Sequence, residues 1–252
     1  MHAYLKLFIL AVFHLILGYG LLTSDQWPLI IVCGIILFYP LHHIGSSIGY
    51  HRLFSHNAFT PRPWYPYLAT FLSSISFFGD PLLYAMVHRI HHRHSDQKGD
   101  PHNPQDGIFH AYIGWMVKFK PTYRDHLVIA DLVRKYPWMV PFGKYEPAVP
   151  IVFYLCLFAI NPTVGYIVLL ASLLAVNSGF YVNAFAHTTK NDTGHQHNAF
   201  DNVFLAKWVN PIFLHKQHHD RGNLIDYSND QVKDIWAPLI RKFFMKIDEP
   251  KI

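Results

Sequence analysis

The sequence predicts an all-α integral-membrane protein with four transmembrane helices in two hairpins, and two observations carry this prediction. Of the 252 residues, 51% are hydrophobic and only 15% are charged, whereas soluble domains carry about 25% charged residues. Four apolar stretches also reach the length of about 20 residues that a helix needs to cross a bilayer. The two cysteines, Cys33 and Cys156, lie inside apolar runs, so we expect no disulfide framework and a single domain over residues 1–252.

The four predicted spans pair across very short breaks. Residues 4–22 and 27–50 are separated by Thr-Ser-Asp-Gln, and residues 138–160 and 163–186 are separated by Asn-Pro. Because a short connection keeps consecutive helices adjacent and antiparallel, each pair is expected to form a helical hairpin. The apolar core of the first span is too long for a secretory leader and no small-residue cleavage site follows it, which predicts an uncleaved anchor.

A fifth apolar stretch, 64–87, differs from the four spans in its polar residues. It contains several serines together with Asp80 and Pro81. We therefore expect it to form a helix that lies in the membrane interface or dips into it, with a fifth span as the alternative.

The distribution of cations predicts the orientation in the membrane. Lysine and arginine are concentrated in the segments 51–137 and 187–252, and neither hairpin turn carries one. By the positive-inside rule, both segments and both termini are expected in the cytoplasm.

Nine of the 19 histidines gather in motifs at the cytoplasmic ends of the predicted spans. On a helix, residues at i, i+3 and i+4 share one face, so each His-x-x-His-His motif presents three imidazoles to one point. The motifs are His51-x4-His56, His88-x2-His91-His92, Asn183-x3-His187 and His215-x2-His218-His219.

These nine imidazoles predict a cytoplasmic cap that holds two metal ions. Unpaired polar groups at a membrane face are costly, which favours coordination. Nine nitrogens exceed the four to six ligands of one ion, so two ions are implied. Imidazole suits zinc, copper, iron and nickel, which leaves the metal open.

Because the chain has no Glu-x-x-His, the carboxylate-bridged di-iron sites of four-helix bundles are excluded. Since His51 and His56 are about 140° apart on an ideal α-helix, the first motif requires local unwinding or two different metals.

Taken together, the four motifs resemble those of the integral-membrane fatty acyl desaturases, especially the Δ9 stearoyl-type branch. The segments Gly-Tyr-His-Arg-Leu-Phe-Ser-His, from Gly49, and Asp-Pro-His-Asn, from Asp100, also resemble stretches of that branch. The resemblance covers about residues 45–225, and the predicted spans fit the four-helix architecture of the family. It implies that Asn183 holds a water that completes the shell of one iron. It also implies that the ligands of a di-iron centre are His51, His56, His88, His91, His92, His187, His215, His218 and His219.

The resemblance implies an oxidoreductase that uses O2 to desaturate a saturated fatty acyl chain, at the Δ9 position and with cis geometry. The implied cofactors are two iron ions that change between Fe2+ and Fe3+. Electrons are expected from a separate donor, either a cytochrome b-type protein or a ferredoxin, and no nucleic-acid partner is expected. The acyl group rides on CoA, a carrier protein or a lipid, and the membrane is the endoplasmic reticulum or a bacterial inner membrane.

Two alternatives to a desaturase remain open from the sequence. A related di-iron membrane hydroxylase or ketolase shares histidine motifs of this kind, and analysis of the product distinguishes it. A histidine-rich zinc transporter would need ionisable residues along a path inside the spans. The chain gathers its histidine motifs at one face instead, with only His14, His42 and His43 lying deeper.

Some polar residues beside the motifs are candidates to fix the imidazole tautomers by hydrogen bonding. These are Asp96, Asp100, Asn103 and Asp220. The remaining cytoplasmic histidines are expected in loops and on the surface, and they are His94, His102, His110, His126, His195 and His197.

The second span also suggests a substrate tunnel. Counting back from His51 along one helical face reaches Ser47, which is small enough for an acyl chain to pass. Further along lies Tyr39, at about 18 Å from His51 for an α-helical rise of 1.5 Å per residue. The sequence therefore predicts that Tyr39 closes the tunnel, with ordinary helix packing as the alternative.

Overall fold

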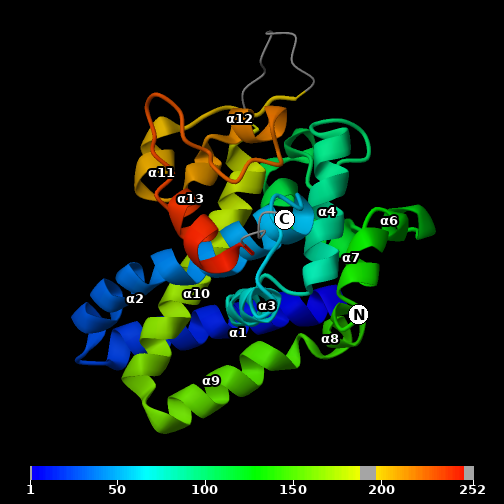
Figure 1. The fold of residues 1–252 in the computed structure, drawn as a ribbon. Coiled ribbons are helices and arrows are strands. Elements are labelled where there is room, and N and C mark those ends of the chain that lie inside the picture. Colours follow the sequence, from blue (N-terminus) through cyan, green and yellow to red (C-terminus); the bar gives the residue numbers. More distant parts are fainter. Residues whose placement is uncertain (1, 188–196, 247–252) are drawn as a thin grey trace.

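The computed structural model describes residues 2–187 and 197–246, and these residues form helices and loops without a β-strand. Figure 1 shows α4, α11 and α12 at one end of the molecule and α9 at the other. The longer helices are α1 (His2–Thr23), α2 (Trp27–His42), the π-helix η1 (His43–Ser55), α3 (Tyr65–Ile75), α4 (Pro81–His94), α9 (Ala148–Ile160) and α10 (Pro162–Phe185). The shorter ones are η2 (Pro104–Asp106), η3 (His110–Gly114), α5 (Trp115–Lys118), α6 (Tyr123–Leu127), α7 (Ala130–Lys135), α8 (Met139–Tyr145), α11 (Val203–Trp208), η4 (Pro211–Phe213), α12 (His215–Asp220), α13 (Trp236–Leu239) and η5 (Ile240–Phe244).

In the part of the chain that the structure describes, three helices are long and apolar enough to cross a membrane, and α8 with α9 makes a fourth if counted together. The three are α1, the continuous helix formed by α2 and η1, and α10. The expected third span, 138–160, is broken by a bend of 61° between α8 and α9. Pro147 lies at the break, where its missing N–H and its ring interrupt the helical hydrogen bonds. Glu146, buried at the same break, pairs with Lys6 of α1 at 3.2 Å.

The second span is longer than the expected 27–50, because α2 runs directly into η1. Together they form one helix of 29 residues, Trp27–Ser55. In η1 the backbone hydrogen bonds join residues five apart, which widens the helix and changes which side chains share a face.

Residues 64–87 form two helices rather than the single interfacial helix expected from the sequence. The chain leaves α3 through Phe77 and Gly79, whose φ angles are 63° and 82°, a left-handed region that helices do not use. Asp80 then caps α4 by accepting a hydrogen bond from the Leu82 N–H, and Pro81 occupies the first helical position. The Asp-Pro pair thus starts a new helix that carries three of the motif histidines.

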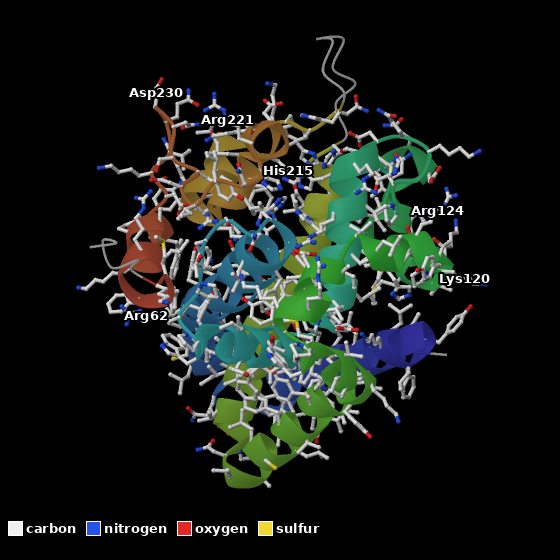
Figure 2. All side chains as sticks on the ribbon, turned by 45° about the vertical axis from the view of Figure 1, so that its right-hand side comes forward. Arg62, Lys120, Arg124, His215, Arg221 and Asp230 are labelled. Atoms are coloured by element: carbon white, nitrogen blue, oxygen red, sulfur yellow. The ribbon has the colours of Figure 1, made fainter. Side chains whose placement is uncertain are left out.

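The helix α10 connects the apolar half of the molecule to the histidine-bearing half. It packs along α2 and also contacts α9 and α1. Gly34 permits the close approach to α2, since a Cβ there would lie 2.7 Å from the Leu170 side chain. Figure 2 shows Arg221, Asp230 and Arg124 on the half of the molecule that carries His215, away from α9.

Candidate metal centre

The structure brings all nine motif histidines into one buried cluster. Within the described residues, their ligating nitrogens form two groups in which all the atoms lie within 4.8 Å of one another. The first group contains His51, His56, His88 and His218. The second group contains His91, His187, His215 and His219. The ninth histidine, His92, joins the first group, because its Nε2 lies 2.7 Å from Nε2 of His218.

The π-helix explains how the i, i+5 pair can face one point. The N–H of His56 donates to the carbonyl of His51 at 3.1 Å, which is the hydrogen bond of a π turn. The two imidazole rings lie 4.8 Å apart, edge to face. The requirement for local unwinding is therefore met by widening of the helix, and both histidines belong to the same group.

The other histidines come from three separate elements. Helix α4 places His88, His91 and His92 on one face, with His91 in the second group and the other two in the first. The short helix α12 divides its motif in the opposite sense, with His218 in the first group and His215 and His219 in the second. His187 lies two residues beyond the end of α10 and is fully buried.

Hydrogen bonds to the outer nitrogens fix the protonation of the second group. The Nδ1 of His187 lies 3.0 Å from a carboxylate oxygen of Asp96, and Nδ1 of His215 lies 3.3 Å from the carbonyl of Ile212. Both partners accept hydrogen bonds, so each Nδ1 carries a proton, which leaves Nε2 as the nitrogen that can bind a metal. These two Nε2 atoms nevertheless lie only 2.8 Å apart. A metal ion bound by both nitrogens would stabilise this close approach.

Carboxylates also organise the neighbouring part of the cluster. The Nδ1 of His91 lies 2.9 Å from Asp100, which also accepts the backbone N–H groups of Asp96 and His102. Two of the four predicted tautomer-fixing residues, Asp96 and Asp100, thus contact ligand candidates. Asp220 instead contacts His197 and Lys216, and Asn103 bonds to Gln97 and Gln105.

The first group has a different kind of support. The Nδ1 of His218 lies 3.2 Å from the hydroxyl of Tyr227. The Tyr227 ring lies beneath the guanidinium of Arg52, which pairs with Asp234 at 2.6 Å. All of these side chains are buried. In contrast, Nδ1 of His51 is buried without a hydrogen-bond partner among the described residues.

Burial keeps seven of the motif histidines neutral and therefore able to bind metal. It lowers the pKa of His56 to about 3, with the charge of Arg89 adding to the effect. Burial and the neighbouring imidazoles also lower the pKa well below its usual value for a further set of ligand candidates, which are His88, His91, His92, His215, His218 and His219. Metal ligation requires neutral imidazole, so this electrostatic environment suits it at neutral pH.

Of the six close Nε2–Nε2 distances among the described histidines, three fit two ligands of one metal ion, and the other three, at 2.7–2.8 Å, are shorter. With metal–nitrogen bonds of about 2.1 Å, neighbouring ligands of one ion lie about 3.0–3.4 Å apart. The Nε2 atoms of His91 and His219 lie 3.2 Å apart, and those of His219 and His215 lie 3.3 Å apart. The Nε2 of His51 lies 3.1 Å from that of His218. The residues present therefore form two adjacent all-nitrogen sites.

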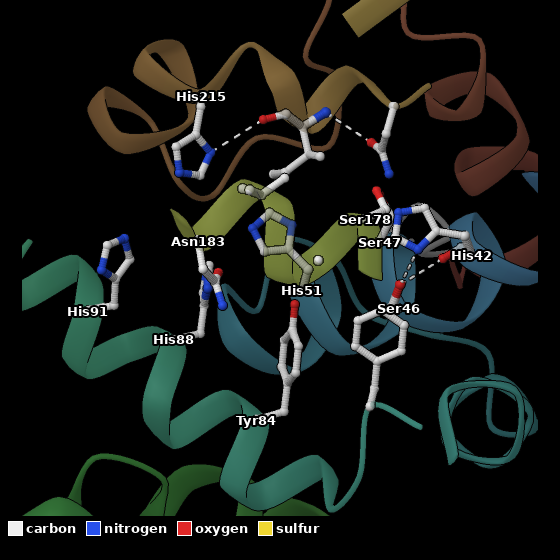
Figure 3. A pocket seen from close by; sticks show the side chains of 15 residues that line it. His42, Ser46, Ser47, His51, Tyr84, His88, His91, Ser178, Asn183 and His215 are labelled. Carbon is white, nitrogen blue, oxygen red and sulfur yellow. Dashed lines mark hydrogen bonds between the residues drawn. The ribbon is translucent and has the colours of Figure 1, made fainter. Parts of the chain in front are cut away.

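Two cavities meet at the cluster. A large cavity of about 670 Å³ contains Trp115, Phe180 and other mainly apolar side chains in its lining. A small cavity of about 60 Å³ continues past the histidines toward α2. The two share Asn183 and Tyr84, and Figure 3 shows both side chains beside the cluster. Asn183 thus lines both cavities beside the histidines.

The two proposed tunnel residues have different positions. Ser47 lines the small cavity, whereas Tyr39 is outside the residues that line either cavity. The Tyr39 hydroxyl donates to the carbonyl of Trp208 at 2.6 Å. An α-helical count across a π-helix loses register, which explains why the face counted back from His51 does not lead to Tyr39.

The remaining histidines lie mostly away from the cluster, with two exceptions. The ring of His102 is buried 4.3 Å from that of His91 and borders the large cavity, and the ring of His197 lies 4.9 Å from that of His219. His126 is exposed, and His195 lies outside the described residues. Sequence reasoning missed Tyr227 and Tyr84 because neither belongs to a motif, although Tyr84 precedes His88 by one helical turn.

A buried cluster of nine imidazoles, reached by a large cavity and carried on apolar helices, defines a membrane metalloprotein candidate. No protein-family model matches the chain. The chain is similar to the acyl-CoA Delta(11) desaturase of Choristoneura rosaceana, with 27% identity over 201 residues, which covers 73% of this chain and 59% of that protein. It is also similar to the sn-1 stearoyl-lipid 9-desaturase of Anabaena variabilis, with 30% identity over 103 residues, or 41% of this chain and 38% of that protein. It is also similar to the sn-2 palmitoyl-lipid 9-desaturase of Nostoc sp. (strain 36), with 28% identity over 196 residues, which covers 73% of this chain and 67% of that protein.

The curated homologues of this chain are thus acyl-CoA and acyl-lipid desaturases, which are oxidoreductases. The resemblance predicted from the histidine motifs is confirmed. The matches to the first two of these relatives span 59% and 38% of the length of those proteins.

Proposed function

We propose that this protein is a membrane desaturase that uses O2 to introduce a double bond into a saturated fatty acyl chain. The observation that carries the proposal is the pair of all-histidine sites at the junction of the two cavities. The desaturase homologues support it independently. Two electrons from a separate donor, two protons and the two substrate hydrogens reduce O2 to two water molecules, so the reaction balances.

We assign one iron to the first group and the other to the second group. His51, His56, His88, His92 and His218 would hold the first iron. His91, His187, His215 and His219 would hold the second, with Asn183 holding a water that completes its shell. Iron with O2 supplies an oxidant strong enough to take hydrogen from an unactivated methylene pair. The protein residues hold the ligand tautomers and position the chain.

The large cavity supports binding of an apolar chain beside both sites. Val87, Phe119 and Phe180 belong to its lining, and its surface includes His88 and Asn183 at the cluster. Closely packed side chains around an acyl chain exclude water from the reacting carbons and fix which methylene pair faces the metals.

The membrane arrangement of the proposed enzyme follows from the charges. We place both termini, the segments 51–137 and 187–252 and the metal centre in the cytoplasm, because lysine and arginine gather there. A soluble cytochrome b-type protein or ferredoxin could then deliver electrons from that side. Cis geometry and the Δ9 position are proposed from the resemblance of the first histidine motif, and two 9-desaturase homologues support the Δ9 position.

The test is expression in a host that lacks its own desaturase, followed by mass spectrometry that locates any new double bond. A cis double bond at carbon 9 that appears only with the wild-type chain is the expected result. A product that gains a hydroxyl or keto group would indicate the hydroxylase or ketolase. Bound zinc, metal transport and no oxygen consumption during turnover would indicate the transporter.

A further inference from the structure

We propose that the small cavity binds a hydroxyl group on the distal part of the acyl chain, so that the preferred substrate is a hydroxylated fatty acyl chain. This inference rests on the proposed function, because it identifies the small cavity as the place where the chain continues past the metal centre. The evidence is a set of buried polar atoms, from three different elements, that line this one cavity without partners.

The unpaired atoms belong to His42, Ser178 and Asn210. All three residues line the small cavity, and His42 and Asn210 are 5% and 1% exposed. The Nε2 of His42, the Oγ of Ser178 and the Nδ2 of Asn210 are buried and have no hydrogen-bond partner among the described residues. Figure 3 shows His42 and Ser178 near each other, across the cavity from His91. An unpaired buried polar group costs folding free energy, so three in one cavity indicate a ligand.

The hydrogen bonds of His42 determine what its free nitrogen can do. The Ser46 hydroxyl donates its single proton to the His42 carbonyl at 2.9 Å. The same oxygen lies 2.8 Å from Nδ1 of His42, so it accepts from that nitrogen. The neutral ring therefore carries its proton on Nδ1, and its Nε2 is an acceptor. Stacking against Phe38 and Phe78, at centroid distances of 5.3 and 6.0 Å, holds the ring in this position.

The other two atoms complete the chemistry of the cavity. The Oδ1 of Asn210 already accepts from the Ile212 N–H at 2.9 Å, so the free Nδ2 is a donor. The Ser178 hydroxyl can donate and accept. The cavity thus offers an acceptor, a donor and a group of either kind. A hydroxyl matches this set because it both donates and accepts, whereas a keto or ester oxygen only accepts and a methyl end does neither.

The rest of the cavity suits the hydrocarbon part of such a chain. Val182, Ile212 and Phe78 contribute apolar surface between the polar atoms and the histidines. Phe78 and Tyr84 also line the large cavity, so one chain can extend from the large cavity past the metal centre into the small one.

The experiment measures binding separately from catalysis. The purified full-length protein in detergent, kept anaerobic and without reductant, is titrated with paired fatty acids from decanoic to octadecanoic acid, each with and without a terminal hydroxyl. The Kd ratio of the plain to the hydroxylated acid is compared between wild type, His42→Phe and Ser178→Ala. The matched control is Thr70→Val, because the Thr70 hydroxyl is also buried and unpaired among the described residues but lies outside both cavities.

For at least one chain length, the ratio is expected to fall about tenfold in both cavity variants and to stay at the wild-type value in Thr70→Val. Ser178→Ala removes a single oxygen, so it keeps the test informative if His42→Phe fails to fold. Equal ratios in all four proteins at every length, or no binding of any probe, would overturn the inference. Loss of desaturation in the host assay with this selectivity intact would instead count against the proposed function.

Discussion

The two groups of histidines differ in what holds their imidazoles. In the second group, carboxylates of Asp96 and Asp100 face the outer nitrogens of His187 and His91. In the first group, the outer nitrogen of His218 faces a neutral hydroxyl and that of His51 has no partner among the described residues. A carboxylate fixes the tautomer and raises the basicity of its imidazole. The second site is therefore organised by charge, and the first by the π-helix and by packing of rings.

The largest effect is expected when a substitution removes a ligand from either group. His218→Ala or His91→Ala should abolish desaturation, since each deletes a nitrogen from a site that is already complete in the structure. Membrane insertion should be unchanged. Product analysis in the desaturase-deficient host measures the effect, with His126→Ala as a control because His126 is exposed. Wild-type activity in either cluster variant would contradict the ligand assignment.

Changing the carboxylates should separate the two groups. Asp96→Asn keeps the shape of the side chain but removes the charge that faces His187, and the expected loss of metal affinity is about 10–100-fold. The loss should be confined to the second group, so metal analysis at limiting iron should show about one ion retained for every two in wild type. Asp220→Asn is the control, because Asp220 contacts His197 and Lys216 instead. Loss of both ions together would show that the sites form one unit.

Acidification tests the neutral state that both groups share. The pKa of His56 is lowered by burial to about 3 in the folded protein, whereas an exposed histidine has a pKa near 6.5. Between these values the unfolded chain binds more protons, so stability is retained above about pH 6.5 and decreases as the pH falls toward 3. The thermal unfolding midpoint of the metal-free protein should accordingly be lower at about pH 5.5 than at pH 7.5. An equal or higher midpoint at the lower pH would argue against a neutral, buried cluster.

The smallest effect is expected from the neutral partner of the first group. Tyr227→Phe removes the hydroxyl beside His218 but keeps the ring that lies against Arg52. We expect metal affinity to fall only a few-fold, in line with about 1 kcal/mol for a neutral hydrogen bond. Metal titration followed by absorbance provides the measurement. A loss as large as that in Asp96→Asn would remove the distinction between the two groups.

The sequence predicted which histidines form the cluster better than it predicted which residues hydrogen-bond to them. Helical spacing and the position of each motif at the end of a span can be read from local sequence, so the sequence alone predicts all nine histidines. The contact of Tyr227 with His218 depends on tertiary packing and leaves no motif. Asp96 and Asp100 were predicted as candidates, but their partners required the fold. Likewise, Pro147 stands in the sequence of the expected third span, yet the prediction treated this span as one unbroken helix, and the structure shows a bend of 61° there.

The π-helix has a consequence for how the length of this segment can vary. Between His51 and His56 the wide turn holds one residue more than an α-helical turn would, and the buried Arg52 lies in that interval. A deletion of one residue there would restore the i, i+4 spacing of an ordinary α-helix and still leave both histidines on one face. An insertion of one residue would rotate them apart. A deletion and an insertion in this interval therefore have different effects. The first site can remain intact when the motif is shortened by one residue, but not when it is lengthened by one.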